Sequence, residues 1–468
     1  MNTQQIIDTE SAHTSGVYPK RPLAIVRGEG AHLWDADGRM YIDCVGGQGA
    51  ANLGHAHPAV VAAIREQAGL LMSCPEIFYN DKRAELLQKL TSLAPAGLTR
   101  AFLCNSGAEA NEAALKFARL ATGRTGIVAT MRGFHGRTMG ALSATWEKTY
   151  REPFAPLIPD FHHVTYNDLA AADAAITDKT AGFLVEVVQG EGGVRPGTAE
   201  YLLGVQALCR ERGAMFIVDE VQTGYGRTGK LFASEHYGLE PDLMPTAKSL
   251  AGGLPFGACL IGSRVGVLAQ STHGTTFGGN PLCCAAAIAA LDALENEHLI
   301  ERSAALGTWL IDCLRKTLPD TQVREVRGLG LMIGIELRSK VAPVLRALQE
   351  RGILALPAGA TVLRLLPPLV IDQSDLESVI EAIEAVLAAQ PEPVERMRPR
   401  GTMPAPPPAG SQCSQDLGLT CKWGTPCNET ECECVASQNG PPAWQCAGSA
   451  CADAGMQIEA GHTGDGGH

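Results

Sequence analysis

The chain has few charged residues, few aromatic residues and no long apolar run. Charged side chains make up 19% and aromatic ones 5% of its 468 residues, and acidic residues outnumber basic ones to give a net charge of −12. This balance gives no overall attraction to nucleic acid or to an anionic membrane, so neither is expected as a partner. No apolar stretch could span a bilayer, and the polar N-terminus lacks a secretory signal. We therefore expect a cytoplasmic globular protein.

Cys-x-x-Cys pairs are also missing, although the chain has 15 cysteines. Those in residues 1–400 are scattered, which is typical of reduced core or turn residues. The others are crowded into the last part of the chain, where a zinc ribbon or finger has weak support without such pairs. We predict that residues 391–468 form a Pro-rich linker and an acidic, Cys-rich tail that is disordered and has no catalytic role. A disulfide-bonded or metal-bound module is the alternative.

Short apolar runs alternate with helical patterns from residue 55 to residue 298. The runs are Ala101–Leu103, Ile127–Ala129, Phe183–Val188, Met215–Val218 and Ala258–Ile261. This alternation is typical of an α/β fold in which helices wrap a mostly parallel sheet. Residues 299–390 indicate a smaller α+β domain, and residues 1–54 an N-terminal segment that joins it.

Two motifs place reactive side chains beside predicted strands. In Phe216–Gln222 an apolar strand ends at Asp219, at the sheet edge where open α/β folds bind ligands. In Pro245–Gly253 small residues surround Lys248, and a desolvated lysine becomes a nucleophile toward carbonyls. Taken alone, Asp219 could be an ordinary cap and Lys248 a surface lysine.

A third motif, Cys104–Asn111, joins a predicted strand to a helix through a glycine turn. The free N–H groups and positive dipole of such a helix start suit a phosphate, although Ser106 could also be a simple N-cap. The loops Met131–Thr138 and His273–Asn280 add an aromatic ring, an arginine and hydroxyl groups. A lysine, a strand-end acid and a phosphate turn together are the set that pyridoxal 5′-phosphate (PLP) chemistry requires.

Residues 15–390 resemble class III, fold-type I PLP-dependent aminotransferases. The resemblance rests on Phe216–Gly229 followed by Lys248, on Asn105–Asn111 and on Thr275–Pro281. Within the class the chain is similar to the acetylornithine aminotransferase branch, and more so to its lysine-biosynthesis relative, which acts on a semialdehyde tethered to the small acidic carrier protein LysW. The passages that carry this finer likeness are Gly16–Tyr18, Tyr41–Gly47, Ala51–His55, Arg132–Met139 and Arg327–Met332.

The resemblance implies roles around the PLP ring. Lys248 would hold the cofactor as a Schiff base and later move the proton of the reaction. Asp219 would pair with the pyridine nitrogen, Gln222 would contact the ring oxygen O3′, and Phe134 would stack on the ring.

The resemblance also implies a phosphate site shared between two subunits. Ser106 belongs to the phosphate turn, where Gly107 and Ala108 would offer backbone N–H groups. Family members usually have threonine where Ala108 stands, so one hydroxyl is missing here. Thr276 would come from the other subunit, which implies a homodimer.

Two arginines would recognise substrate carboxylates. Arg364 matches the arginine that binds glutamate, and Arg137 the one that binds the α-carboxylate of the acylated substrate. Glu191 would pair with Arg364 when the longer substrate enters, while Tyr18 and Thr275 would line the substrate side. Such a switch lets one pocket alternate between a diacid and an ω-aldehyde.

The resemblance implies a ping-pong aminotransferase. Glutamate would leave as 2-oxoglutarate, and its amino group would pass to the terminal aldehyde of LysW-bound aminoadipate semialdehyde in lysine biosynthesis. N-acetylornithine aminotransferase of arginine biosynthesis, or an enzyme with both activities, is the alternative. An aminomutase or decarboxylase fits the Arg364 and Glu191 pair poorly, and a catalytically dead binding scaffold fits the intact Lys248 and Asp219 poorly.

Overall fold

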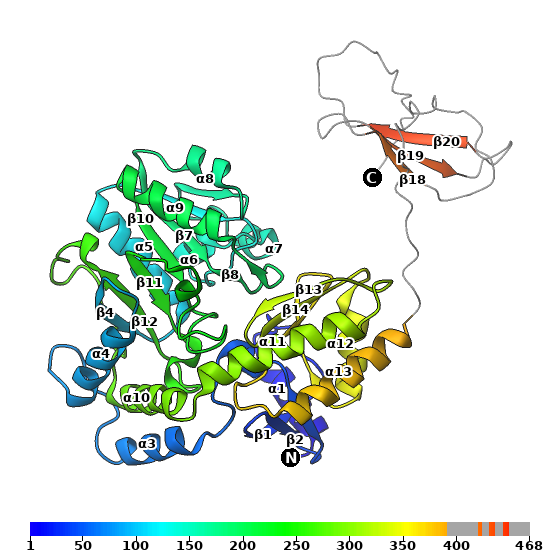
Figure 1. The fold of residues 1–468 in the computed structure, drawn as a ribbon, viewed down its shortest axis with the longest axis horizontal. Helices are drawn as coiled ribbons and strands as arrows, with labels where there is room; N and C mark the ends of the chain where they lie inside the picture. Colours follow the sequence, from blue (N-terminus) through cyan, green and yellow to red (C-terminus); the bar gives the residue numbers. More distant parts are fainter. Residues whose placement is uncertain (391–419, 424–429, 436–442, 449–468) are drawn as a thin grey trace, which may run out of the picture. The chain divides into compact units, whose positions relative to one another are not determined.

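The computed structural model describes residues 1–390 together with residues 420–423, 430–435 and 443–448 (Figure 1). Residues 1–393 form one compact unit and residues 394–468 a second. None of the helices in the described residues is long and apolar enough to cross a membrane.

A seven-stranded sheet forms the centre of the first unit. Its strands lie in the order β4 (Leu98–Cys104), β12 (Gly257–Gly262), β11 (Leu243–Thr246), β10 (Met215–Asp219), β7 (Thr180–Glu186), β5 (Gly126–Thr130) and β6 (Phe161–Val164). All neighbours are parallel except β12, which runs antiparallel to β11 and β4. The mostly parallel α/β sheet expected from the sequence is confirmed.

Helices cover both faces of this sheet (Figure 1). They are α4 (Asp81–Leu93), α5 (Gly107–Thr122), α6 (Met139–Ala144), α8 (Leu169–Ala175) and α9 (Ala199–Arg212), while α3 (Pro58–Ala68) packs against α10 (Pro281–Asn296). In β10, Ile217 packs with residues of α5, whereas Phe216 and Val218 pack with residues of α8 and α9. Burial on both faces explains why the strand is apolar throughout instead of alternating.

Residues 299–390 build an antiparallel sheet and its helices. The sheet has the order β13 (Val323–Leu329), β14 (Met332–Leu337), β17 (Val362–Leu365) and β16 (Leu356–Ala358), and the helices are α11 (Leu299–Thr317), α12 (Val341–Glu350) and α13 (Gln373–Ala388). A further sheet joins β1 (Ile25–Glu29), β2 (His32–Asp35) and β3 (Met40–Asp43) to β15 (Ile353–Leu354). The N-terminal segment therefore shares a sheet with residues 299–390. The division at residues 54 and 298 stays a prediction.

Buried Arg227 ties three distant parts of the chain together. Its guanidinium donates to the carbonyl oxygens of Leu331 at 2.9 Å and Pro367 at 2.5 Å, and to Oδ1 of Asn52 at 2.7 Å. The side chain is fully buried, and burial lowers its pKa to about 9. A desolvated charge needs such partners, so this arginine holds the N-terminal and C-terminal segments against the loop after β10.

The C-terminal unit contains a three-stranded antiparallel sheet of β18 (Thr420–Trp423), β19 (Thr430–Val435) and β20 (Ala443–Gly448). Cys432 stands opposite both Cys421 and Cys446 in the register. These strands occur in the segment for which the sequence predicted disorder. The predicted linker and the redox or metal state of the tail cysteines lie outside the described residues.

Candidate active site

Lys248 lies directly after β11, at the start of the short 3-10 helix η3 (Lys248–Ala251). Its φ is +48°, a left-handed conformation that is costly for a lysine and is typical of functional positions. Burial lowers the pKa of Lys248 below its usual value of 10.5; Arg364 adds to this shift, while the carboxylates of Glu191, Asp219 and Glu186 oppose it. A lowered pKa makes the neutral, nucleophilic amine more abundant.

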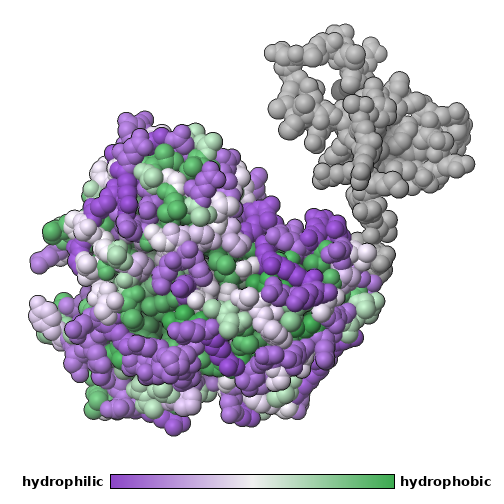
Figure 2. All heavy atoms as spheres, in the orientation of Figure 1, coloured by the Kyte–Doolittle hydropathy of each residue, from purple (hydrophilic) through white to green (hydrophobic). Residues whose placement is uncertain are grey.

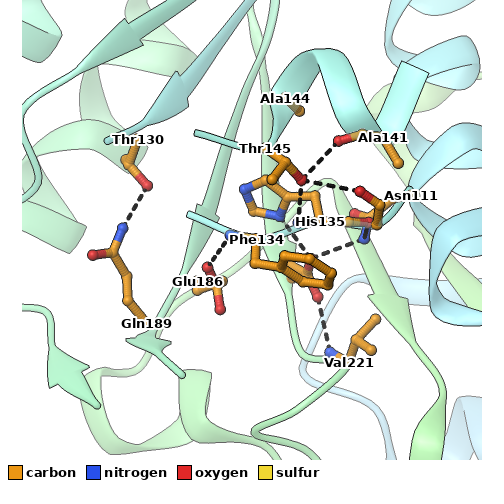
Figure 3. Close-up of polar contacts among 12 residues, drawn as sticks. Asn111, Thr130, Phe134, His135, Ala141, Ala144, Thr145, Glu186, Gln189 and Val221 are labelled. Carbon is orange, nitrogen blue, oxygen red and sulfur yellow. Dashed lines mark hydrogen bonds and ion pairs between the residues drawn. The ribbon is translucent and has the colours of Figure 1, made fainter. Parts of the chain in front are cut away.

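Asp219 ends β10 and is 3% exposed. Its Oδ2 accepts hydrogen bonds from His135 Nδ1 at 2.7 Å and Asn111 Nδ2 at 2.8 Å, and its Oδ1 accepts one from the backbone N–H of Val221 at 2.9 Å (Figure 3). These three donors compensate for the cost of burying a carboxylate. The backbone N–H of His135 donates in turn to Thr145 Oγ1 at 2.9 Å, which fixes the backbone at this residue (Figure 3).

The N-terminus of α5 opens toward the same region. Ser106 caps the helix, since its side chain accepts from the N–H of Glu109 at 3.2 Å. A Cβ on Gly107 would come within 2.6 Å of Val221 Cγ1, so this close approach requires glycine. The methyl of Ala108 packs in the same way, because a Cβ on Gly136 would lie 2.8 Å from it. The 16-residue helix thus presents free N–H groups and a positive dipole end.

Arg364 and Glu191 form an ion pair beside Lys248. Arg364 Nη1 lies 2.7 Å from Glu191 Oε1 and 3.2 Å from Gln222 Oε1. Burial raises the pKa of Glu191, but Arg364 outweighs that effect, and the pKa ends below its usual range. Arg364 is 2% exposed and its buried Nε has no protein partner in the described residues, so the guanidinium has capacity left for a ligand.

Phe134 is held by a buried glutamate that the sequence analysis did not single out. Glu186, at the end of β7, accepts from the backbone N–H of Phe134 at 2.9 Å (Figure 3). It also accepts from the backbone N–H of Gly190 at 3.3 Å. Burial raises the pKa of Glu186 to about 7. Because the chain turns here, the apolar run predicted as one strand is two, β7 and β8 (Val188–Gln189). Glu186 therefore links the Phe134 loop to the Glu191 loop.

Arg137 lies over two aromatic rings near the surface. Its guanidinium carbon is 3.5 Å from the centre of the Tyr150 ring and 5.5 Å from that of Phe134. The two rings meet edge to face at 6.2 Å. A guanidinium is attracted to an aromatic face, so Tyr150 and Phe134 together orient an otherwise exposed arginine.

The structure brings most of the predicted site residues together, but not all. Thr275 accepts a hydrogen bond from Asn105 Nδ2 at 2.9 Å, beside the α5 turn. Thr276 is exposed and Tyr18 is 75% exposed, and within the described residues neither side chain makes a hydrogen bond to another site residue. Their predicted roles therefore depend on a second chain or on a ligand.

The sequence analysis missed the residues that support the site from behind. His135 and Asn111 stand inside two of the motifs that it quoted, but their contact with Asp219 spans 84 and 108 residues of sequence. Tyr150 lies outside every quoted motif, and Glu186 stands inside the run Phe183–Val188, which was quoted only as a strand. A polar residue at the end of an otherwise apolar strand is the signal that could have indicated Glu186.

These residues fit PLP. The buried acid with its three fixed donors can pair with a pyridine nitrogen, and the lysine of lowered pKa can react with an aldehyde. The aromatic ring suits the face of the cofactor ring, and the helix N-terminus suits its phosphate. Fold and site together define a fold-type I PLP-dependent enzyme. The family model of the class III aminotransferases matches residues 15–387, and the chain belongs to this family.

Known relatives and solved structures agree with this family. The chain is 50% identical over 390 residues to a [LysW]-aminoadipate semialdehyde transaminase of Deinococcus radiodurans, covering 82% of this chain and 91% of the relative. It is 43% identical to an acetylornithine aminotransferase of Methanothermobacter thermautotrophicus, covering 83% and 100%. The ornithine aminotransferase of Toxoplasma gondii, solved with partial PLP occupancy, superposes with a TM-score of 0.80 at 34% identity over 83% of this chain and 94% of that one. The protein is therefore a PLP-dependent aminotransferase.

Proposed function

We propose that the enzyme moves the amino group of glutamate to the terminal aldehyde of a LysW-bound aminoadipate semialdehyde in lysine biosynthesis. The observation that carries this proposal is the ion pair of Arg364 and Glu191 beside Lys248, with Arg137 as a second arginine nearby. When glutamate binds, Arg364 is available for one carboxylate. When a substrate without a distal carboxylate binds, Glu191 neutralises Arg364, which would otherwise remain an unpaired buried cation.

Each residue near the cofactor has a proposed task. Lys248 binds PLP covalently and moves a proton at its Nζ once the substrate amine has replaced it. Asp219 pairs with the pyridine nitrogen, and its hydrogen bonds from His135 and Asn111 keep its carboxylate oriented. Gln222 contacts the ring oxygen. When bound, the protonated pyridine ring acts as an electron sink for the carbon that loses its proton.

Other residues fix the position of the cofactor and the substrates. Phe134 stacks on the ring, and Ser106, Gly107 and Ala108 hold the phosphate at the start of α5. Because Ala108 lacks a hydroxyl, the backbone donors do this work. Arg137 binds the α-carboxylate of the second substrate, and Tyr18 and Thr275 line its path.

We also propose a homodimer in which Thr276 completes the phosphate site of the partner. Large apolar side chains are exposed at Leu70, Met72, Ile77 and Phe277, with exposed fractions of 57–81%. Apolar residues also form a band across the middle of the face in Figure 2. Exposed apolar surface of this kind is typical of an interface, and Phe277 stands next to Thr276.

N-acetylornithine is the alternative product, and with it an enzyme active in both pathways. It presents the same reacting end and the same α-carboxylate, and the acetylornithine aminotransferases among the relatives favour it. Comparing kcat/KM for the carrier-linked and the free acetylated substrates decides between them. We expect the carrier-linked substrate to be preferred at least tenfold. A preference for free acetylornithine would overturn the proposal while leaving the aminotransferase class intact.

A further inference from the structure

A cavity of about 430 Å³ lies beside the candidate active site. Phe134 and Glu191 line it on one side, and Trp146 and Tyr150 form an aromatic wall. The face of Tyr150 also carries the Arg137 guanidinium at 3.5 Å. The cavity therefore adjoins the arginine proposed to hold the α-carboxylate of the second substrate. It has the size of a small-molecule site.

Two arginines from different segments line this cavity. Arg132 follows β5 and Arg195 starts β9 (Arg195–Pro196). Arg132 is exposed and has a φ of +67°, a left-handed conformation that costs free energy in an arginine. It packs against Gly192, where an added Cβ would lie 2.6 Å from the Arg132 carbonyl oxygen. The loop is thus fixed tightly while its side chain faces solvent.

Arg195 is only partly satisfied by protein groups. Its Nη2 lies 3.0 Å from Glu336 Oε2, but that carboxylate is shared with Arg327 Nη1 at 2.6 Å. Its Nε is buried and has no hydrogen-bond partner among the described residues. Burial lowers the pKa of Arg195, and the neighbouring Arg327 adds to this shift, while Glu336 opposes it.

The acids on the cavity wall do not cancel this charge. Glu191 is paired with Arg364, and Glu336 is shared by Arg195 and Arg327. Glu147 is exposed and accepts from the backbone and hydroxyl of Thr149. N–H donors of the Arg132 and Arg195 guanidinium groups are therefore available for an anionic ligand. A carboxylate matches the geometry of a guanidinium.

We propose that this cavity binds the acyl group on the α-nitrogen of the second substrate, and that Arg132 and Arg195 bind a carboxylate carried by that acyl group. The inference rests on the proposed function and names its substrate class: an amino acid acylated by a dicarboxylic or acidic-peptide group. A site built for a polar group discriminates against an analogue that lacks it, because the site's own polar groups stay unpaired.

Two free substrates of equal length test the proposal. N2-glutaryl-L-lysine and N2-pentanoyl-L-lysine have the same acyl chain length and differ in the terminal carboxylate. Each serves as amino donor to 2-oxoglutarate in the reverse direction, and kcat/KM is measured for both. We expect the wild-type enzyme to prefer the glutaryl substrate by about tenfold to hundredfold. A ratio near one would overturn the subsite.

Variants locate the effect on the two arginines. Arg132→Ala, whose side chain is exposed, should lower the glutaryl-to-pentanoyl ratio without disturbing the core, and the double variant with Arg195→Gln should bring it near one. Arg210→Ala is the matched control, since Arg210 is an exposed arginine paired with Glu240 on the remote helix α9. An unchanged ratio in the double variant would contradict the proposal.

The glutamate half-reaction separates this inference from the proposed function. Glutamate added without an acceptor should change the visible absorbance of the bound cofactor in the wild type. If it does not, the proposed function fails. If it does and the substrate ratio is near one, only the subsite fails.

Discussion

The two sides of the active site are built in opposite ways. On the cofactor side, Asp219, His135 and Asn111 are buried and hydrogen-bonded to one another. On the proposed substrate side, Arg364 is buried against Glu191, but Arg137 and Arg132 are exposed, and the contacts of Arg137 are with aromatic faces. The difference follows from what each side must bind. One cofactor needs a single fixed geometry, whereas two unlike substrates need side chains that can change partners.

Replacing Lys248 should have the largest effect and test whether the cofactor side works as a fixed unit. We expect Lys248→Ala to lower kcat by about 10⁴-fold or more, because in the proposed function this lysine is both the nucleophile and the proton carrier. The visible absorbance of the covalently bound cofactor should also vanish. Lys316→Ala, an exposed lysine on α11, is the control and should retain both properties. If the Lys248→Ala enzyme were still active and coloured, Lys248 could not be the residue that binds the cofactor covalently.

Changing the buried acid should have the next largest effect. Asp219→Asn keeps the shape but removes the negative charge, so we expect kcat/KM to fall about 10²- to 10³-fold for both substrates alike. His135→Gln should act in the same direction with a smaller loss, because it disturbs only the orientation of Asp219. Steady-state kinetics of both half-reactions measure this. A loss confined to one substrate would break the proposed distinction between the two sides.

The Glu191 switch should affect the two substrates differently. Glu191→Gln removes the charge that neutralises Arg364, so the arginine stays free for the carboxylate of glutamate. We expect the KM for glutamate to stay or fall, while kcat/KM for the aldehyde substrate falls about tenfold. Separate half-reaction measurements are needed. Equal losses in both would show that Glu191 supports the fold instead of switching.

The smallest expected effect concerns pH and stability. The pKa of Glu186 is about 7 in the folded protein and lies above the usual 4.5. The folded state therefore holds the proton more tightly, and stability is lost as the pH rises from about 4.5 to about 7. In Glu186→Gln this loss should be absent. The free energy of unfolding of the variant relative to the wild type should therefore be about 1–3 kcal/mol more favourable to the variant at pH 7.5 than at pH 4.5. Denaturant midpoints at both pH values measure the difference, and parallel curves would argue against a titrating Glu186.

The sequence predicted the residues proposed to contact the cofactor better than the residues that hold them in place. Lys248, Asp219 and the Gly107 turn could be found because each stands at the end of an apolar run with a recognisable neighbourhood. The bonds from His135 and Asn111 to Asp219 could not, because hydrogen bonds between distant residues leave no periodic pattern. The unpaired donor of Arg195 depends on Glu336 and Arg327, in strands more than a hundred residues away.

The fold was predictable where periodicity was strong. Strand β10 was predicted as Met215–Val218, one residue short of its observed bounds, Met215–Asp219. The tail strands were not predicted, because the cysteines were considered only as possible disulfide or metal-binding residues. Cys432 and Cys434 alternate with glutamates in β19, and this period of two residues is typical of a strand.

The buried Arg227 has a consequence for how the chain folds. Its partners Asn52, Leu331 and Pro367 come from opposite ends of the main unit, so the guanidinium cannot leave water until nearly all of that unit has been synthesised. A nascent chain that stops at residue 298 should then remain incompletely folded and protease-sensitive, even though every strand of the large sheet is already present. Limited proteolysis of that fragment against residues 1–393 checks this, and a resistant fragment would show that the sheet matures without its arginine anchor.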